Sequence, residues 1–533
     1  MLVLVIFSAC NIVTNLIVDD RACIDKLPYA KDVSASKSKA CLSGTRVALL
    51  EKIQVWALDP TRQRALLLHG AAGKGKSAIV HTVAIALESL GVAVVPFFAF
   101  NRSVKDRSLS QLIPTWAKQL AESNPQYLHY LHNHPKYLQS LDILTQLDLV
   151  VKGLASIDDK VPLIFIIDAL DECPAEDANA LFNLLRELLS SSELPCSVRF
   201  LFTFRPNKSI TSPFSNLPAL SLSIDNINDT SRDIHTFIKY QFNGSDLEYM
   251  IDDVAKASQT LFQCAAILCR ELKSGQGPKL SSERRELLRK VRDAPGRPLY
   301  ATYHAILKLH FDERNAELMQ LFRRVMSWIF LLRSPQPRQV LQAFAAVLLP
   351  ADERSDVDEI LAWLGSLLSG TTPGDDAPIS PLHTSLCDFL LDTTESGAFS
   401  IDLGHHSQEE IAWACLKIMN TSLEFNICKL PKSFALNSEI EDLLQRVNEH
   451  ISPGLCYACL ATAQHLRSVS PPSIMINQHL NTTVLHRPSI KVLVGIACVI
   501  LVYMSTSFAF LFFAAMLKFL YHGQGNVSLS SWC

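Results

Sequence analysis

The feature that most restricts the folds open to this chain is a glycine-rich segment between an apolar run and a helix-like stretch. The segment reads Gly70-Ala71-Ala72-Gly73-Lys74-Gly75-Lys76-Ser77, and it follows residues 65–68 and precedes residues 78–87. The order strand, glycine loop and helix brings backbone N–H groups and a positive helix end to one place, which suits a phosphate. In such a loop Lys76 would reach the β- and γ-phosphates of a nucleotide, and the Ser77 hydroxyl would ligate Mg²⁺. The whole segment is a candidate nucleotide site, although so short a string also occurs by chance.

A second apolar run supplies the acidic groups that such a site needs. Residues 163–167 are apolar and are followed by Asp168-Ala169-Leu170-Asp171-Glu172-Cys173. This pattern is typical of a buried parallel strand that ends at an active-site edge. We expect Asp168 to hold Mg²⁺ near Ser77, and Glu172 or Asp171 to polarise an attacking water. A core strand followed by a solvated helix start is the alternative, and the glycine loop upstream argues against it.

Two further apolar runs predict strands of the same sheet. Residues 198–202 lead to Arg205, which is a candidate γ-phosphate sensor or, equally, a surface arginine beside Pro206. Residues 92–98 form the other run. We therefore predict an α/β fold in which residues 41–215 form a three-layer α/β/α P-loop NTPase domain, with the nucleotide at the carboxyl edge of a mostly parallel sheet.

Composition narrows the class of protein and its partners. With 533 residues, of which 48% are hydrophobic, the chain can form several domains. The net charge of −3, without a basic block, gives no reason to expect a nucleic-acid partner. The 14 cysteines are scattered, and the close pair Cys456 and Cys459 lacks a second pair at zinc spacing. Reduced thiols in a cytoplasmic protein are expected.

Two hydrophobic stretches lie near the ends of the chain. Residues 2–18 are interrupted by polar residues and follow no basic residue, which favours a buried helix over a signal peptide or membrane span. Residues 492–517 carry no charge and are flanked by Lys491 and Lys518, so they are a candidate transmembrane helix and tail anchor. An artefactual tail and a hairpin bent at residues 505–507 are the alternatives.

With the glycine loop and the acidic segment 168–173, the chain resembles the NACHT-domain P-loop NTPases of the STAND class, and in particular their fungal, NLR-like members. The resemblance spans roughly residues 30–470. It also rests on residues 41–60, 112–120, 299–309 and 322–325. One departure is Ser258-Gln259-Thr260, which stands where the family usually has a glycine before Leu-Phe.

The resemblance implies a succession of domains. We expect an N-terminal helical segment at 1–40, the nucleotide domain at 41–215, a helical domain at 216–295, a winged-helix-like domain at 296–395, a helical segment at 396–470 and a linker at 471–491 before the candidate span at 492–517. No period of 20 to 50 residues recurs, so the repeat array that often accompanies a NACHT core is not evident.

Leu382-His383-Thr384 is similar to the Met-His-Asp motif of related switch ATPases. In those proteins the histidine contacts the β-phosphate of ADP and keeps the closed state, which implies that role for His383. Thr384 replaces the aspartate of the motif, which weakens the comparison. A histidine packed at a helix start is the alternative.

The resemblance implies a nucleotide-dependent signalling switch. ADP would be bound at rest, exchange for ATP or GTP would allow homo-oligomerisation, and slow hydrolysis through Glu172 would reset the protein. The family's roles in fungal non-self recognition and programmed cell death, with an unknown effector or sensor partner, are implied in the same way. Two alternatives stay open: an ATPase with steady turnover that remodels other proteins, and a membrane-anchored nucleotide-binding scaffold without hydrolysis. The intact Asp171 and Glu172 argue against the scaffold.

Overall fold

The structure is a computed structural model that describes most of residues 27–469. Its gaps are residues 28, 31–32, 103, 105–106, 135–142, 156, 158–161, 207–218, 226, 228, 373, 375, 425 and 431–439. The predicted buried helix at 2–18 and the candidate span at 492–517 both lie outside the described residues. Within the described part of the chain, no helix has the length and apolar character needed to cross a bilayer.

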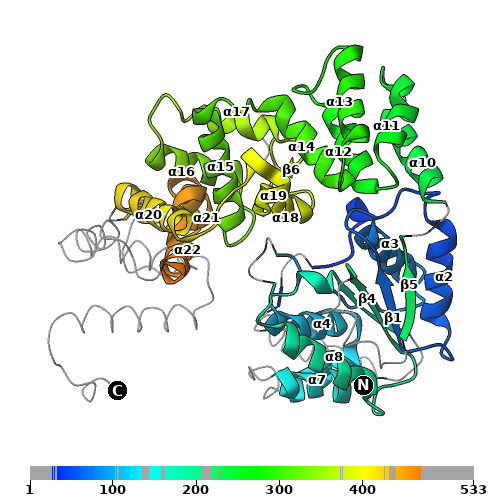
Figure 1. The fold of residues 1–533 in the computed structure, drawn as a ribbon. Coiled ribbons are helices and arrows are strands. Elements are labelled where there is room, and N and C mark those ends of the chain that lie inside the picture. The colour runs from blue at the N-terminus through cyan, green and yellow to red at the C-terminus, as the bar shows by residue number, and fades with distance from the viewer. Residues whose placement is uncertain are drawn as a thin grey trace, which may run out of the picture. The chain divides into compact units, whose positions relative to one another are not determined.

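The chain divides into two compact units (Figure 1). The first contains the residues up to Leu307 together with His383–Leu386. The second contains Lys308–Leu382 and the residues from Cys387 onward. The short segment 383–386 therefore belongs to a different unit from the residues on either side of it.

A five-stranded parallel sheet forms the centre of the first unit. Its strands are β1 (Ala65–His69), β2 (Phe97–Ala99), β3 (Leu163–Asp168), β4 (Val198–Phe204) and β5 (Ala219–Ser223), in the order β2-β3-β4-β1-β5. Every residue of β3 and β4 is buried, and apart from Asp168, Arg199 and Thr203 these residues are apolar, as expected of central strands covered on both faces. The predicted α/β nucleotide-binding fold is confirmed.

Helices cover both faces of this sheet. They are α2 (Val47–Leu58), α3 (Lys76–Ser89), α4 (Leu109–Ser123), α5 (Pro125–Asn133), α7 (Ile143–Ala155) and α8 (Ala178–Ser190). His81 of α3 stacks on Phe97, whereas Trp116 of α4 packs edge-on against Phe165. Phe97 pairs with Ile166, so it lies on the face opposite to that of Phe165 because successive strand residues alternate. The nucleotide domain thus has the predicted three layers.

Two strands differ from the sequence prediction. β2 is shorter than the predicted run 92–98, and Val94 makes only an isolated bridge to Leu163. Pro96 has no N–H to give to a ladder, and the N–H of Phe97 donates to the Gln119 side chain instead. The edge strand β5 was not predicted, because its exposed serines make it a weak apolar signal.

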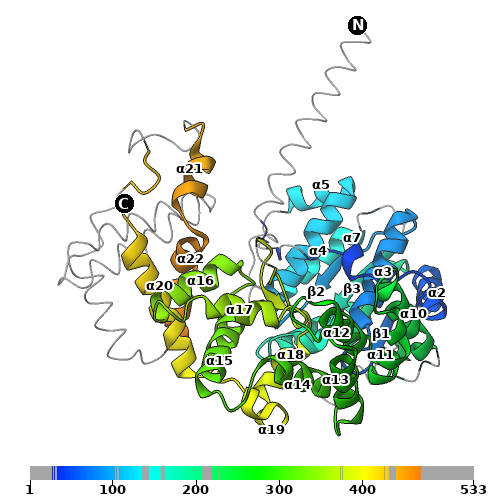
Figure 2. The ribbon, with the colours of Figure 1, turned by 90° about the horizontal axis from the view of Figure 1, so that it is seen from above.

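A helical region completes the first unit. It contains α10 (Thr230–Phe242), α11 (Ile251–Ala257), α12 (Phe262–Lys273), α13 (Ser281–Asp293) and most of α14 (Pro298–His310), whose residues from Lys308 onward belong to the second unit. Helices α11, α12 and α13 lie side by side (Figure 2). They share a core of their own, which includes Val254, Leu268 and Leu288. Helices α10 to α13 lie within the helical domain predicted at 216–295, but β5 lies within the same range and belongs to the sheet.

The second unit is largely helical. It contains α15 (Ala316–Leu331), α16 (Arg338–Leu348), α17 (Asp356–Trp363), the antiparallel pair β6 (Leu368–Ser369) and β7 (Ser380–Pro381), α18 (Ser385–Leu391) from Cys387 onward, α19 (Thr393–Ser396), α20 (His405–Ser422), α21 (Leu443–His450) and α22 (Pro453–Ser468). Glu410 of α20 links to α15 by accepting from Arg324 and from the indole of Trp328. Cys456 and Cys459 lie in α22. The predicted domain boundaries within this region stay predictions.

Candidate functional site

The glycine loop connects β1 to α3 and follows a path that only glycine adopts easily. Gly73 and Gly75 have φ values of 76° and 92°. A Cβ atom at Gly73 would also lie 2.9 Å from the Cβ of Gln263, so a side chain there would collide with α12. Gly75 is the N-cap of α3. The loop therefore presents the N-terminus of a long helix at the carboxyl edge of the sheet, as the sequence predicts.

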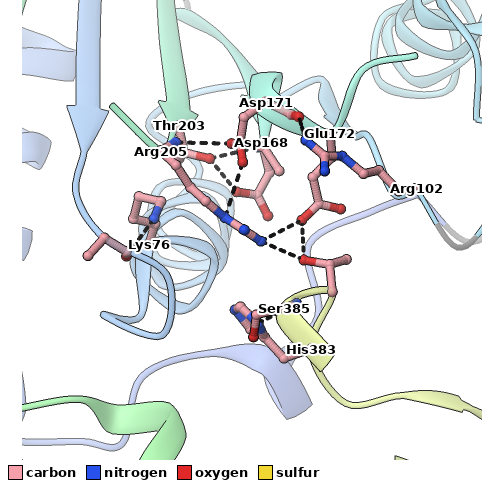
Figure 3. Close-up of polar contacts among 12 residues, drawn as sticks. Lys76, Arg102, Asp168, Asp171, Glu172, Thr203, Arg205, His383 and Ser385 are labelled. Carbon is pink, nitrogen blue, oxygen red and sulfur yellow. Dashed lines mark hydrogen bonds and ion pairs between the residues drawn. The ribbon is translucent and has the colours of Figure 1, made fainter. Parts of the chain in front are cut away.

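Lys76 lies across the loop in which it stands. Its Nζ donates to the carbonyl oxygens of Gly70 and Ala71, at 2.7 and 3.0 Å (Figure 3). Burial lowers the pKa of Lys76 to about 8, although Asp171 opposes that shift. Among the described residues, the Lys76 ammonium group donates to these two neutral carbonyls, and a partly desolvated ammonium group so placed is suited to receive an anion such as a phosphate.

Asp168 ends β3 and is held by a residue of the neighbouring strand. Its Oδ1 accepts a hydrogen bond from Thr203 Oγ1 at 2.5 Å, and Thr203 Oγ1 in turn accepts from the N–H of Ala169 at 2.7 Å. Ala169 has a φ of 61°, in the left-handed region. Thr203 therefore fixes both the carboxylate and the turn that follows it. The sequence analysis assigned no role to Thr203, although it directly precedes Phe204 and the predicted sensor Arg205.

Asp171 is occupied by Arg205. Its Oδ1 accepts from the backbone N–H of Arg205 at 3.0 Å, and its Oδ2 lies 3.2 Å from Arg205 Nε. The carbonyl oxygen of Asp171 also accepts from Arg102 Nη2 at 2.5 Å. The Asp171 side chain is only 4% exposed. These contacts make Asp171 the group that orients Arg205, and they favour Glu172 as the predicted base.

Glu172 lies in a different environment. Its Oε1 accepts from Thr384 Oγ1 at 2.7 Å and lies 3.8 Å from Arg205 Nη2. Burial raises the pKa of Glu172 to about 7, and the bond from Thr384 opposes that shift. A carboxylate with a pKa near neutrality is suited to accept a proton from water.

His383 is fixed by its neighbours in the same unit. Its Nδ1 accepts from the backbone N–H of Ser385 at 3.1 Å and lies 2.6 Å from Ser385 Oγ, which is 2.8 Å from the Tyr303 hydroxyl. Because Nδ1 is an acceptor, the neutral ring carries its proton on Nε2. The structure thus brings His383 into the unit that holds the glycine loop and places it just before α18, as the alternative of a histidine at a helix start describes, and its contact with a phosphate stays a prediction.

The helical region is joined to the loop by further bonds. The N–H of Gln263 donates to the Gly73 carbonyl at 3.1 Å, and Lys74 Nζ donates to Thr260 Oγ1 at 3.0 Å. Thr260 has a φ of 67°, the conformation for which the glycine usual at this place is suited. Thr260 therefore adopts the left-handed backbone conformation that the family's glycine would adopt at this place. Its hydroxyl also contacts the glycine loop.

Two charged residues near the loop were missed by the sequence analysis. Arg46 is buried, and it donates from Nη2 to the Lys74 carbonyl and from its backbone N–H to Asp233. Asp225, just after β5, accepts from the N–H of Ala71 at 2.8 Å. Arg46 lies in the segment 41–46 that carried part of the resemblance, whereas Asp225 follows the strand that the sequence did not reveal.

The donor set is compatible with magnesium. Ser77 is exposed in the first turn of α3, and Asp168 is 5% exposed at the end of β3. No cluster of three or more His, Cys, Asp or Glu that could hold a metal occurs among the described residues. Mg²⁺ usually takes one or two protein ligands and completes its shell with water and phosphate oxygens, so one hydroxyl and one carboxylate suffice.

Comparison with known protein families supports a P-loop domain in this part of the chain. Residues 44–205 match the family model described as the N-terminal region of nephrocystin 3. The matched region includes the glycine loop, the carboxylates after β3 and Arg205. No curated protein gives a significant match. Together with the sheet and the loop, the match shows that the chain contains a nucleotide-binding P-loop NTPase domain.

Several solved structures are similar at low sequence identity. Cdc6p from Pyrobaculum aerophilum has 13% identity and a TM-score of 0.34, over 70% of this chain and 97% of that chain. ORC from Drosophila, solved bound to DNA, has 14% identity and a TM-score of 0.32, over 68% and 88%. DnaA from Aquifex aeolicus, solved with AMPPCP, has 13% identity and a TM-score of 0.30, over 54% and 86%.

Proposed function

We propose that this protein is a nucleotide-dependent switch of the NACHT type, in the STAND class. The observation that carries the proposal is the position of the 383–386 segment. Thr384 contacts both Glu172 and Arg205, and His383 is fixed beside it, all in the unit that contains the glycine loop. Such a contact can couple the predicted base to the position of a segment that lies 212 residues away in the sequence.

Nucleotide binding would use the loop and the two predicted magnesium ligands. Backbone N–H groups of the loop and Lys76 would hold the phosphates, and Ser77 and Asp168 would hold Mg²⁺. When bound, the ion would neutralise charge on the β- and γ-phosphates. The loop residues contact phosphate and not the base, so the proposal covers both ATP and GTP.

Hydrolysis would depend on Glu172 and Arg205. Glu172 in its ionised form would take a proton from the attacking water. Arg205, oriented by Asp171, would stabilise charge that develops on the transferred phosphoryl group. Because the Glu172 oxygen that faces Arg205 also accepts from Thr384, we expect slow turnover in this arrangement.

The switch itself would arise from contacts that depend on the nucleotide. His383 would donate from Nε2 to the β-phosphate of ADP and so favour the resting state. Exchange for a triphosphate would shift the population toward a state that self-associates. A signalling role such as fungal non-self recognition or programmed cell death, an effector or sensor partner, and a cytoplasmic location with a tether at 492–517 complete the proposal.

Identification of the bound nucleotide in the purified full chain tests this function. Wild-type protein is expected to carry ADP or GDP, and Lys76→Ala is expected to lose it. Lys52→Ala, at an exposed position on α2, is the matched control and should retain the nucleotide. Wild-type protein that neither carries nor binds any purine nucleotide would overturn the proposal.

Turnover separates the switch from the remodelling ATPase. A switch should hydrolyse slowly and change its rate when it self-associates, whereas a remodelling ATPase should turn over steadily. A scaffold should show equal phosphate production in wild-type protein and in Glu172→Gln. Steady-state phosphate release at several protein concentrations measures all three.

A further inference from the structure

We propose that Thr384 is a positioning residue that restrains the Glu172 carboxylate, so that docking of the segment 383–386 suppresses hydrolysis. The inference rests on the proposed function and adds a regulatory contact to it. Thr384 does not need to touch the nucleotide for this role. It acts through Glu172.

When Glu172 is ionised, the hydrogen bonds of the Thr384 hydroxyl have only one consistent direction. Arg205 has donors and no acceptor, so Arg205 Nη2 must donate to Thr384 Oγ1, at 2.8 Å. The hydroxyl proton is then left for Glu172 Oε1, at 2.7 Å. An ionised carboxylate only accepts, so the three groups satisfy one another (Figure 3).

This arrangement accounts for a threonine at position 384. The Met-His-Asp pattern would place an aspartate there, and its carboxylate would stand within hydrogen-bond distance of Glu172. Two like charges at that distance repel, and Asp168 and Asp171 already add negative charge near Glu172. A hydroxyl can donate to Glu172, which a carboxylate cannot do when ionised.

The two residues that follow Thr384 keep it in this position. Ser385 is buried and contacts the Tyr303 hydroxyl, and Leu386 is buried in the same unit. Leu382 and Cys387, which flank the segment, belong to the other unit. Movement of the segment away from Tyr303 would therefore withdraw the Thr384 hydroxyl from Glu172.

The chemical consequence concerns the base. A carboxylate oxygen that accepts a hydroxyl proton is less basic and is not open to a water molecule on that side. While Thr384 is docked, Glu172 is thus a weaker base than its burial alone would make it. Withdrawal of Thr384 would restore that basicity, which couples release of the segment to hydrolysis.

The first arm of the test needs no nucleotide. Amide hydrogen exchange in the full chain is followed for peptides that cover residues 383–390. Thr384→Val keeps the shape but loses the hydroxyl, and it should speed exchange there by about tenfold, while Thr384→Ser should match wild type. Combined with Glu172→Ala, the valine change should add little, because both remove the same contact. Unchanged exchange in Thr384→Val would overturn the inference.

The second arm measures hydrolysis. Thr384→Val should raise kcat by roughly three- to tenfold with KM unchanged, and Thr384→Ser should restore the wild-type kcat. A kcat in Thr384→Val equal to or lower than that of wild type would contradict the proposal that Thr384 restrains Glu172. If wild-type protein binds no nucleotide, the proposed function fails, and the exchange arm alone decides whether Thr384 is bound to Glu172.

Discussion

Arg205 is bound to Asp171 at two points, through its backbone N–H at 3.0 Å and through its guanidinium Nε at 3.2 Å. The arginine that follows β4 is thus oriented by a carboxylate from the turn after β3. Its guanidinium nitrogen Nη2 faces Thr384 and Glu172. The predicted sensor and the predicted base are therefore parts of one hydrogen-bonded cluster.

Loss of the Asp171 charge should destabilise the first unit. Asp171→Asn keeps an oxygen that can accept from the Arg205 N–H but removes the ion pair with Nε. We expect the free energy of unfolding to fall by roughly 1 to 3 kcal/mol, since Arg205 is 25% exposed and water partly screens the pair. Urea unfolding measures the change. Glu176→Gln, at an exposed position five residues further along the chain, should have little effect.

Thr203 should be required to position Asp168. Thr203→Val removes the donor to Asp168 and the acceptor for the Ala169 N–H at a fully buried position. We expect the free energy of unfolding to fall by about 1 to 3 kcal/mol and nucleotide affinity to lose part of its magnesium dependence. Binding of a fluorescent nucleotide with and without Mg²⁺ measures the second effect. Thr203→Ser keeps the hydroxyl and should retain most of both properties.

The pKa of Glu172 predicts how stability depends on pH. In the folded state its pKa is raised from 4.5 to about 7 by burial, so the folded protein holds this proton over a range in which the unfolded chain has lost it. The associated stabilisation is complete below about pH 4.5 and is lost as pH rises through about 7, by up to ~3 kcal/mol.

Glu172→Gln isolates this effect. In wild-type protein the free energy of unfolding should fall between pH 4.5 and 7 as Glu172 loses its proton. In the variant this contribution to the fall should be absent. The difference between the two proteins in urea unfolding at several pH values gives the contribution of Glu172. Parallel curves for wild type and variant would show that the carboxyl group is not titrating in this range.

Thr260 should show two opposing effects of substitution. Thr260→Val keeps the left-handed backbone strain and loses the hydroxyl that accepts from Lys74, which should cost about 1 kcal/mol. Thr260→Gly loses the same bond but relieves strain of about 1 kcal/mol, so its net effect should be small. Thermal unfolding of the two variants distinguishes them. A glycine variant less stable than the valine variant would contradict the role assigned to the backbone.

The candidate span at 492–517 makes a prediction about cell membranes. If it anchors the chain, carbonate extraction should leave the full-length protein in the membrane pellet. A chain that ends at residue 470 should then move to the soluble fraction. Release of the full-length protein by carbonate would rule out a membrane-spanning segment.

The sequence by itself determined the nucleotide-binding class of the first unit. The loop from Gly70 to Ser77 and the carboxylates from Asp168 to Glu172 each lie within a few residues of an apolar strand. Local order and spacing place such groups at the end of a strand, whichever other segments surround them. For the same reason Arg205 could be placed at the end of β4 before its partner was known.

Only the tertiary structure decided which of the two acidic residues, Asp171 or Glu172, anchors Arg205 and which is the predicted base. Thr203 lies 35 residues from Asp168, and Thr384 lies 212 residues from Glu172. No periodicity or spacing connects residues so far apart, and hydroxyl groups leave no mark in a hydrophobic pattern. Folding brought Arg205 to Asp171 and Thr384 to Glu172, and so made one acidic residue an anchor and the other a restrained base. That distinction depends on hydrogen-bond geometry between distant segments, which exists only once the chain has folded.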